Sequence, residues 1–277
     1  MARKSKTWFI TGCTSGFGRA LAEHCLSRGD RVAVTALAIR DVADIGTKFA
    51  DSALLLQLDV TKPAEVRSAI AQAFEYFGEV DVLVNNAGYA IQTSVEDADD
   101  QMIRRMFEVN LFGMLDVIRA ALPRLRQQGH GHIMNFSSVG GRVSGPLVAL
   151  YCSSKFAVEG MSLGLAAELA PFGLKVTTIE PGSFATNFGT ATIRPEPSEA
   201  YRSHAEQMKA HLAVLPTNDP ARLANVIAQV ADSDNPPLQM IVGEDAYVMI
   251  SEFAASQRKE METWHALSAS ASQPSKP

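Results

Sequence analysis

Short apolar runs alternate with amphipathic stretches along most of this chain. Seven runs have the length and apolar character of buried strands: Thr7–Thr11, Arg31–Ala36, Ala53–Leu58, Val80–Asn85, Gly131–Ser138, Leu174–Glu180 and Leu238–Val242. The stretches between them have helical spacing. One predicted helix ends at Arg28, and the others cover Pro63–Tyr76, Asp99–Gln127, Tyr151–Leu169 and Pro220–Ala231. Strands that alternate with helices are typical of a parallel sheet. The pattern predicts an α/β fold: one Rossmann-like, doubly wound parallel sheet of about seven strands, with helices on both faces.

Two segments depart from this alternation. Residues 184–216 hold three prolines and follow Pro181-Gly182, at the carboxyl ends of the predicted strands, where such sheets bind ligands. We predict that this segment is a substrate lid, and a surface loop without function is the alternative. The last ten residues, SASASQPSKP, lack a core pattern, so 268–277 are expected to be a disordered tail. One catalytic domain would then cover 1–267.

The first predicted strand runs directly into a glycine-rich turn that opens a helix. Gly12 permits a tight turn, Gly16 lets the backbone approach a pyrophosphate, and Gly18 allows the helix to pack closely on the strand. The helix N-terminus favours phosphate charge. A plain connecting turn is the alternative, but the flanking strand and helix are those of a dinucleotide-binding unit. The residues predicted to bind the dinucleotide here are Gly12, Thr14, Ser15, Gly16, Phe17 and Gly18.

Tyr151 and Lys155 lie four residues apart in a predicted helix, so they share a face. A cation beside a phenol stabilises the phenolate and lowers a pKa that is ordinarily about 10. A tyrosine tuned in this way serves as an acid or base near neutral pH. Such pairs arise by chance on many solvated helices, so a catalytic interpretation needs supporting motifs elsewhere in the sequence. Ser138, upstream of the pair, and the glycine-rich turn are such motifs.

Together these motifs resemble the short-chain dehydrogenase/reductase family, in its form with a Thr-Gly-x-x-x-Gly-x-Gly loop. The resemblance covers nearly the whole chain, and further signals stand in the family's order: Asp59, Asn85-Asn86-Ala87-Gly88, Asn110, Asn135-Phe136-Ser137-Ser138, and Pro181-Gly182 followed by Thr186. It implies an NAD(P)-dependent oxidoreductase that acts on a carbonyl or a secondary alcohol. The catalytic residues it implies are Asn110, Ser138, Tyr151 and Lys155.

The same resemblance implies roles around the cofactor. Asp59, followed by Val60, would contact the adenine, and Asn86, Ala87 and Gly88 would line the adenosine side. Thr186, which follows Pro181 and Gly182, would hold the nicotinamide carboxamide. Lys155, beside Tyr151, would also hold the nicotinamide ribose, and Asn110 would anchor a water that feeds the proton relay. For Asn110, a helix asparagine that bonds nearby backbone is the alternative.

The chemistry of carbonyl reduction explains why these residue types are needed. Hydride transfer develops negative charge on the carbonyl oxygen, which must be stabilised and then protonated. We expect Tyr151 to be the acid and Ser138 to donate a second hydrogen bond to the same oxygen. An apolar substrate pocket, suited to a hydrophobic or cyclic carbonyl, is predicted from Val143, Leu147, Phe184 and Phe188.

Other classes of function remain open. A catalytically idle redox sensor would bind the nucleotide and turn nothing over, and a lyase or epimerase could use the same scaffold. A hydrolase is not favoured, because neither Ser137 nor Ser138 stands in a Gly-x-Ser-x-Gly elbow or has an evident histidine base.

The end of the second predicted strand bears on the choice of cofactor. An acid there would bind the ribose 2′-hydroxyl of NAD, and an arginine would accommodate the 2′-phosphate of NADP. Ala36 and Leu37 supply neither, so nothing repels the phosphate, and Arg40 stands three positions after Leu37. We predict NAD(P)(H) binding with a slight preference for NADP(H), through Leu37 and Arg40.

The composition mainly argues against certain partners and structural features. The net charge of −5 and the scattered basic residues predict neither a nucleic-acid partner nor a polybasic membrane surface. No apolar run approaches the ~18 residues of a spanning helix, so membrane insertion is not expected. Three cysteines are too few for a disulfide framework and suit the reducing cytoplasm. Members of the family often form dimers or tetramers, which implies a homo-oligomer.

Several residues are expected to have structural roles only. His130 and His132 have no acidic or cysteine residue at a metal-binding spacing, so no metal is predicted. Cys152 is expected to fill the core as a small apolar side chain. Trp264 and the stretch Met240–Phe253 are likewise expected to be core.

Overall fold

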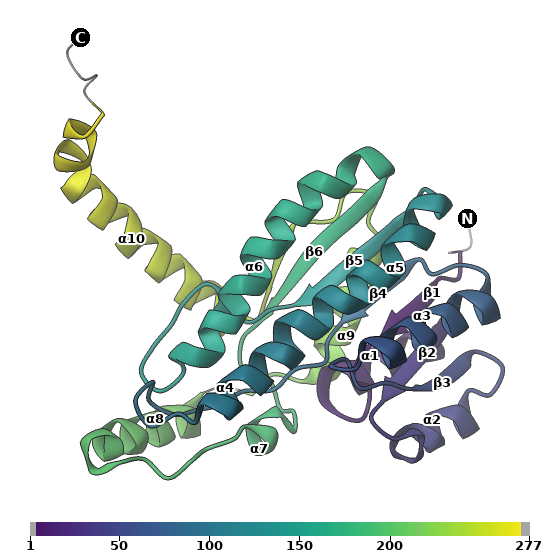
Figure 1. Cartoon of the computed structure of the whole chain (residues 1–277), viewed down its shortest axis with the longest axis horizontal. Helices are drawn as coiled ribbons and strands as arrows, with labels where there is room; N and C mark the ends of the chain where they lie inside the picture. The colour runs from purple at the N-terminus through teal and green to yellow at the C-terminus, as the bar shows by residue number, and fades with distance from the viewer. Residues whose placement is uncertain (1–3, 216, 273–277) are drawn as a thin grey trace.

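The computed structural model describes residues 4–215 and 217–272, and it confirms the α/β fold. Seven parallel strands form one sheet in the order β3-β2-β1-β4-β5-β6-β7, with helices on both faces (Figure 1). The strands are β1 (Thr7–Ile10), β2 (Arg31–Ala36), β3 (Ala53–Gln57), β4 (Val82–Asn85), β5 (Gly131–Phe136), β6 (Leu174–Pro181) and β7 (Gln239–Val242). All seven coincide with the predicted runs to within two residues at each end.

The helices form two layers. On one face α1 (Gly16–Ser27) packs beside α9 (Pro220–Asp232), and on the other lie α3 (Pro63–Phe77), α5 (Met114–Gln128) and α6 (Ala149–Leu169). The remaining helical elements are η1 (Ile39–Val42), α2 (Ala43–Lys48), α4 (Asp100–Phe107), η2 (Glu108–Gly113), η3 (Val139–Gly141), η4 (Ala170–Phe172), α7 (Phe188–Ala191), η5 (Glu199–Tyr201), α8 (Arg202–Val214) and α10 (Glu244–Ser270).

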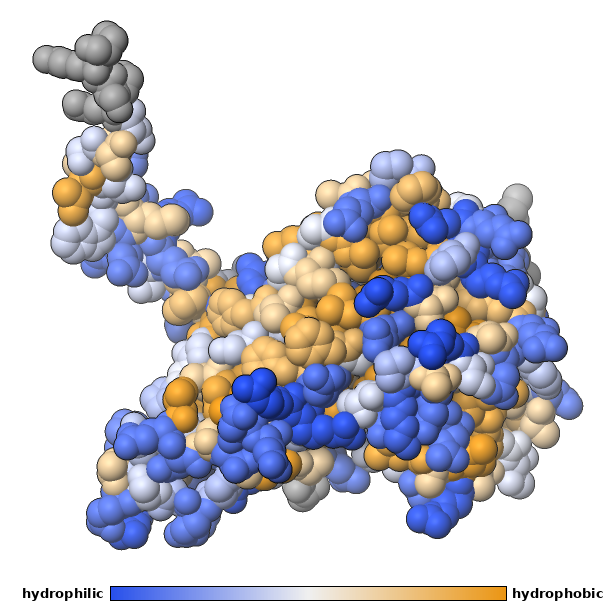
Figure 2. All heavy atoms as spheres, in the orientation of Figure 1, coloured by the Kyte–Doolittle hydropathy of each residue, from blue (hydrophilic) through white to orange (hydrophobic). Residues whose placement is uncertain are grey.

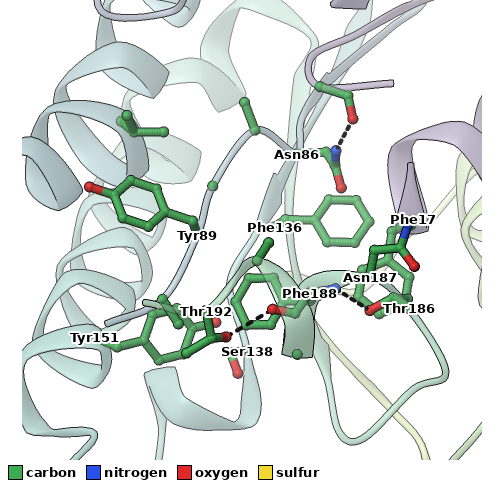
Figure 3. Close-up of a pocket in the computed structure, with 18 of the residues that line it drawn as sticks. Phe17, Asn86, Tyr89, Phe136, Ser138, Tyr151, Thr186, Asn187, Phe188 and Thr192 are labelled. Atoms are coloured by element: carbon green, nitrogen blue, oxygen red, sulfur yellow. Dashed lines mark hydrogen bonds between the residues drawn. The ribbon is translucent and has the colours of Figure 1, made fainter. Parts of the chain in front are cut away.

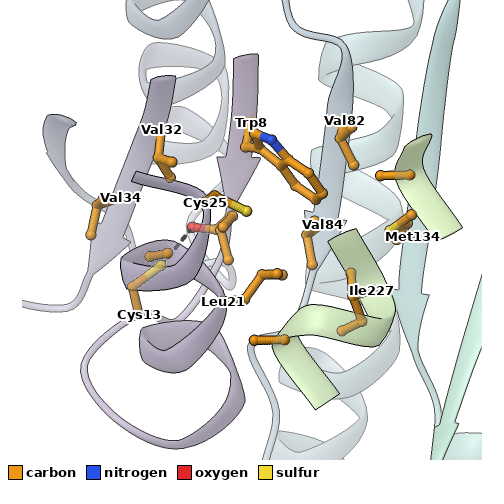
Figure 4. Packing of buried hydrophobic residues seen from close by; sticks show 14 of the residues in the cluster. Trp8, Cys13, Leu21, Cys25, Val32, Val34, Val82, Val84, Met134 and Ile227 are labelled. Atoms are coloured by element: carbon orange, nitrogen blue, oxygen red, sulfur yellow. Dashed lines mark hydrogen bonds between the residues drawn. The ribbon is translucent and has the colours of Figure 1, made fainter. Parts of the chain in front are cut away.

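Burial on both faces explains why the central strands are continuous apolar runs. Trp8 packs with Leu21 of α1 and Ile227 of α9 on one side of β1 (Figure 4), whereas Phe9 belongs to the core on the other side. Each such side chain stabilises the fold by roughly 1.5–3 kcal/mol when fully buried. The indole N–H of Trp8 donates to Asp30 at 3.0 Å, so its polar edge is also satisfied.

The order of the strands reverses on either side of β1. This strand pairs with β2 on one side and with β4 on the other. In open α/β sheets, ligands bind at such a switch point, outside the carboxyl ends of the strands. Two predicted motifs leave the sheet here: the glycine-rich turn after β1, and Asn86-Ala87-Gly88 after β4. The fold therefore brings both motifs to one crevice.

The predicted helix Asp99–Gln127 is not continuous. It is divided into α4, the π-helical segment η2 and α5, and Asn110 lies buried within η2. A π-helical segment inserts an extra residue into a helical turn and often marks a functional site. The apolar periodicity alone did not reveal this interruption.

Residues 184–216 are more regular than predicted. They contain α7, η5 and α8, and isolated bridges join Phe184 to Asn218 and Ile193 to Ile91. Pro195 and Pro197 fall in the link between α7 and η5, and Pro216 lies outside the described residues. Pro195 and Pro197 therefore lie in a short irregular link, whereas helices occupy much of the rest of the segment.

The helix α10 was not predicted, and it extends away from the body of the molecule (Figure 1). Its first turns bury Ala246 and Ile250, but every described residue after Phe253 is exposed. The expected core position of Trp264 is wrong, because 58% of this residue is exposed. The predicted disordered tail is wrong for Ser268–Ser270, which are helical, and residues 273–277 lie outside the described part. Within that part, no helix combines the length and apolar character needed to cross a membrane.

Candidate functional site

A cavity of about 680 Å³ opens at the carboxyl ends of the central strands, a volume typical of cofactor and small-molecule sites. Its walls come from the turns after β1, β4, β5 and β6, from α6 and from the segment after β6 (Figure 3). Every predicted cofactor-binding residue lines it except Gly18 and Arg40. Among the predicted catalytic residues, Ser138, Tyr151 and Lys155 line it, and Asn110 lies behind the wall.

The glycine-rich turn has the backbone that its glycines were predicted to allow. Gly12 and Gly16 have φ angles of +73° and +59°, which other residues adopt at a cost. A Cβ on Gly18 would overlap the carbonyl oxygen of Gly12, so Gly18 packs the helix onto the turn without lining the cavity. Asn86 braces the turn, since its Nδ2 donates to the carbonyls of Thr11 at 2.8 Å and Gly12 at 3.0 Å.

The start of α1 fits a phosphate group. This helix begins at Gly16 beside the cavity. Ser15 occupies the N-cap position, and its side chain makes no capping hydrogen bond to the first N–H groups of the helix. Uncapped N–H groups and the helix dipole together attract anions. With the close backbone approach at Gly12 and Gly16, the turn fits the pyrophosphate of a dinucleotide.

The adenosine end of the predicted site holds one basic residue that was not predicted. Arg105 lines the cavity, 3.4 Å from the carboxylate of Asp59, whose other oxygen accepts from the backbone N–H of Thr61 at 3.0 Å. Leu37 lines the cavity as predicted. Arg40 does not: its side chain is 89% exposed and lies 3.8 Å from Asp41. No local sequence signal places Arg105, on α4, beside Asp59.

Tyr151 and Ser138 lie side by side at the other end of the cavity (Figure 3). Ser138 follows β5, and its Oγ accepts from the N–H of Gly140 at 3.0 Å. Burial raises the pKa of Tyr151 above its ordinary value, and a hydrogen bond with the Ser138 side chain partly opposes that shift. The ring of Phe188 packs against Tyr151 with 5.8 Å between centroids. The phenol therefore keeps its proton at neutral pH and is ready to act as an acid.

Lys155 lies on the same face of α6, with Nζ 5.9 Å from the centroid of the Tyr151 ring. It is buried, and Nζ donates to the carbonyl of Phe136 at 2.8 Å. Burial lowers the pKa of Lys155 to about 8, and the charge of Glu159 partly opposes this shift. We expected Lys155 to lower the pKa of Tyr151. In this structure the expectation fails, because burial governs both groups and pushes each toward its neutral form.

Asn110 has the backbone-bonding role that was the alternative for this residue. Its Oδ1 accepts from the N–H of Tyr89 at 3.0 Å, and its Nδ2 donates to the Tyr89 carbonyl at 2.9 Å and to Ser154 Oγ at 3.1 Å. It thereby holds the chain after β4 against α6. A Cβ on Gly88 would stand 3.1 Å from Asn110 Oδ1 and 3.7 Å from Lys155 Nζ, so Asn110 and Lys155 meet at Gly88.

The segment after β6 closes the remaining side of the cavity. Gly16 and Thr186 approach each other, since a Cβ on Gly16 would lie 3.5 Å from the Cβ of Thr186. Phe17 stacks on Phe136 at 5.6 Å and meets Phe184 edge-on at 5.2 Å. The cavity wall thus joins the glycine-rich turn to the start of the predicted lid.

The apolar character of the pocket agrees with the prediction, but its residues only partly do. Phe184 and Phe188 line the cavity, whereas Val143 and Leu147 do not. Apolar and aromatic lining residues that were not predicted include Tyr89, Ile91, Val148, Met208 and Leu212. Met208 and Leu212 belong to α8, which no local sequence signal places over the strand ends.

His130 lies outside this cavity, at the amino ends of the strands. Its Nε2 is 3.9 Å from carboxylate oxygens of both Glu79 and Asp81, so acidic partners are present despite the unpromising spacing. Its Nδ1 is 2.7 Å from the amide nitrogen of Gln128, and Glu79 also pairs with Arg31 at 3.5 Å. These groups form an ion-pair network. Cys152 is buried, as predicted.

Comparison with known sequences gives consistent similarities. A family model described as short chain dehydrogenase matches residues 6–197. The oxidoreductase BOA17 of Botryotinia fuckeliana is 38% identical over 269 residues, which cover 95% of this chain and 98% of that protein. A 3-ketodihydrosphingosine reductase of Bacteroides thetaiotaomicron is 32% identical over 248 residues, covering 88% of this chain and 90% of that protein.

Solved structures give the same picture. A short-chain dehydrogenase from Streptomyces avermitilis has a TM-score of 0.92 and 36% identity, covering 98% of this chain and 100% of that one. A short chain dehydrogenase from Burkholderia cenocepacia in complex with NADP has a TM-score of 0.75 and 26% identity, with coverage of 95% and 98%. A 3-ketoacyl-(acyl-carrier-protein) reductase from Brucella melitensis complexed with NADH has a TM-score of 0.74 and 26% identity, with coverage of 86% and 97%.

Proposed function

This chain belongs to the short-chain dehydrogenase/reductase family of oxidoreductases, and from that premise we propose that it reduces an apolar ketone or aldehyde, or oxidises the corresponding secondary alcohol. The observation that supports this most directly is the meeting of Tyr151, Ser138 and Lys155 in the cavity that also contains the glycine-rich turn. One cavity therefore offers a place for a dinucleotide and a proton donor for a carbonyl oxygen.

Each residue has a defined part in this reaction. A bound nicotinamide cofactor supplies or accepts the hydride. Tyr151 gives its phenolic proton to the developing oxyanion, and Ser138, whose Oγ accepts from Gly140, uses its own hydrogen to bond the same oxygen. Lys155 has three donors, of which one goes to the Phe136 carbonyl, so the others are available to the ribose and the proton relay.

The lining of the cavity supports an apolar substrate. Phe188, Val148, Met208 and Leu212 line the same cavity as Tyr151, and three of them belong to the segment 184–216, which supports its proposed role as a lid. The Bacteroides relative named for a 3-keto substrate makes long-chain 3-ketones a natural part of any screen. We therefore propose a hydrophobic or cyclic carbonyl as the substrate class.

A carbonyl screen tests this proposal. The purified protein is mixed with NADPH or NADH and with long-chain, cyclic, aromatic and short-chain ketones, and the loss of reduced-nicotinamide absorbance is recorded. We expect turnover with apolar ketones and little with short polar ones. Cofactor binding without turnover on any carbonyl or alcohol would identify the alternative, a catalytically idle redox sensor.

We further propose a modest preference for NADP(H) over NAD(H). The support is the lack of an acid at Ala36 and Leu37, where a carboxylate would repel a 2′-phosphate. Arg40 would have to turn toward the cavity to reach that phosphate, because its side chain is exposed. The ratio of kcat/KM values for the two cofactors decides the matter.

The assembly and location of the protein are also proposals. A homo-oligomer is supported by apolar residues exposed on the part of α10 after Phe253, which are Met261, Trp264 and Leu267. A cytoplasmic location is supported by the cysteines, all three of which are buried thiols. The mass of the native protein in solution and subcellular fractionation test the two statements.

A further inference from the structure

Two buried glutamates lie behind the catalytic pair and have no part in the chemistry above. Glu159 is on α6, one helical turn after Lys155, and Glu180 is near the end of β6. The residues are 5% and 0% exposed, and neither lines the cavity. Burying a carboxylate is costly unless it is paired and hydrogen-bonded, so two of them together require an explanation.

A single threonine hydroxyl connects the two carboxyl groups. Thr178 Oγ1 lies 3.0 Å from Glu159 Oε2 and 3.3 Å from Glu180 Oε1. A hydroxyl carries one hydrogen, so Thr178 can donate to only one of these oxygens. The other contact is favourable only when that carboxyl group is protonated and donates to Thr178. The geometry therefore points to a chain from a carboxylic acid through the hydroxyl to a carboxylate, with one proton on the pair.

The surrounding charges agree with one proton. Arg142 Nη1 lies 3.3 Å from each oxygen of Glu180, and Gln239 Nε2 donates to Glu159 Oε2 at 3.0 Å. Among the described residues, Arg142 is the cation in direct contact with the pair, so two ionised carboxylates would share one direct counterion. Burial and then the charge of Glu159 raise the pKa of Glu180 above its ordinary range. Such protons belong to the pair and not to either residue.

The pair is connected to the catalytic lysine through α6. Burial lowers the pKa of Lys155 to about 8, and Glu159 is the group whose negative charge opposes that shift. Gly141 allows the close packing: a Cβ there would stand 3.1 Å from Glu159 Cγ and 3.2 Å from the carbonyl oxygen of Lys155. Asp245, on α10, is a carboxylate outside this pair: it accepts hydrogen bonds from the Ser183 N–H and from the side-chain amide of Asn218.

We propose that Glu159 and Glu180 share one proton and act as positioning residues that keep Lys155 charged and fixed beside Tyr151. The proton moves between the two carboxyl groups through the hydroxyl of Thr178, which accepts one proton and gives up another, and no electron is transferred. The functional part of the inference rests on the proposed function, since Lys155 acts through proton transfer at Tyr151. The shared proton itself does not, and it is tested separately.

Infrared spectroscopy of the protein without cofactor tests the shared proton. At neutral pH we expect a protonated carboxylic acid C=O band that shifts in D₂O. Glu159→Gln should abolish it, because Glu180 then stays ionised beside Arg142. Glu180→Gln should also abolish it, because Glu159 then has no second carboxyl group to share a proton with and accepts from Thr178 and Gln239. Glu168→Gln, the same change at an exposed position of α6, should leave the band intact. The absence of the band from the parent protein would overturn the proposal, whatever the enzyme does.

The pH dependence of carbonyl reduction tests the positioning role. Glu159→Gln removes the charge that raises the pKa of Lys155, so the alkaline limb of kcat/KM should move down by about one pH unit. Glu159→Asp keeps that charge and should move the limb less. Glu180→Gln leaves Glu159 ionised and should move the limb upward. A structural role alone would lower the melting temperature without shifts of opposite sign, and unmoved limbs in both glutamine variants would refute the positioning role.

The two experiments can refute the shared proton and the proposed function separately. A parent protein with the infrared band but without any turnover would contradict the proposed function and leave the shared proton established. Turnover with an ordinary Glu180 carboxylate would support the proposed function and exclude the pair. Melting temperatures of all variants are measured beside Glu168→Gln to confirm that each protein is folded.

Discussion

At the scale of single residues, burial shifts the pKa values of the two reacting groups in opposite directions. The pKa of Tyr151 is raised and that of Lys155 is lowered, to about 8, because a buried site disfavours both the phenolate and the ammonium. The tyrosine is thereby kept as an acid, and the lysine becomes sensitive to the charges around it. The sequence could predict the residues but not this consequence, since the depth of burial depends on the whole fold.

The first prediction concerns Tyr151. Tyr151→Phe keeps the ring that packs on Phe188 and removes the proton, so turnover should fall by ~10²–10⁴, the usual contribution of a positioned acid. Cofactor affinity, measured by fluorescence titration, should stay within about twofold. Tyr76→Phe, on the exposed face of α3, is the matched control and should leave the rate unchanged. Near-normal turnover in Tyr151→Phe would refute the proposed mechanism.

The second prediction concerns Lys155 and has a definite sign with pH. The ammonium of Lys155 is lost as the pH rises through about 8, so the parent should show a falling limb of kcat/KM for reduction in that region. Lys155→Met should be slower at every pH, bind cofactor more weakly and lack this limb. Lys48→Met removes a lysine outside the cavity and should retain the parent profile. If Lys155→Met kept the limb, another group would be its source.

At the scale of elements, the sequence was informative wherever a local rule decides the structure. The glycine-rich turn, the strands and the Tyr151–Lys155 face of α6 could all be predicted, because glycine geometry, apolar runs and helical spacing are local properties. The π-helical η2 and the packing of α8 over the cavity could not, since both depend on contacts between segments far apart in the chain. Arg105 is the plainest case: it meets Asp59 only after the fold brings α4 to the segment that follows β3.

The third prediction tests the contact between β1 and α1. Gly18→Ala would place a methyl group 3.0 Å from the carbonyl carbon of Gly12 and into the carbonyl oxygen, so the turn must shift. We expect a loss of about 1–3 kcal/mol of stability and a clear rise in cofactor Kd. Gly164→Ala, also within a helix but with open space around the added carbon, should raise stability by about 0.5–1 kcal/mol. Thermal unfolding and cofactor titration of both variants provide the comparison, and unaltered cofactor affinity in Gly18→Ala would contradict this role.

The fourth prediction belongs to the end of β2. Ala36→Asp places a carboxylate where it would repel a 2′-phosphate and accept from ribose hydroxyls, so the preference should move toward NADH. The measured quantity is the ratio of kcat/KM values for NADPH and NADH, which we expect to exceed one modestly in the parent. Arg40→Ala should lower this ratio if the guanidinium turns to the phosphate. A parent that strongly prefers NADH, with Arg40→Ala silent, would overturn the proposed preference for NADP(H).

At the scale of the whole molecule, the helices α6 and α10 both carry exposed apolar side chains. Phe156 and Leu163 are exposed on α6, where Figure 2 shows apolar atoms across the centre of the face. Met261 and Trp264 are exposed on α10, and helical spacing puts them on the side of the helix that buries Ile250 nearer the body. The sequence alone suggested a buried Trp264, because tryptophan is typical of protein cores. No local sequence signal shows that α10 extends beyond the body of the molecule.

The last prediction tests whether α10 contributes to an assembly of identical chains. Arg258 and Glu260, which carry opposite charges, flank its apolar side, so the helix complements a second copy of itself better than an anionic membrane. Trp264→Glu should therefore reduce the mass measured by light scattering by about half. Ala266→Glu adds the same charge two residues later, away from the apolar side, and should leave the mass unchanged. Turnover per chain should persist in both variants, since neither residue lines the cavity. An unchanged mass in Trp264→Glu would show that α10 takes no part in the assembly and would direct attention to the face of α6.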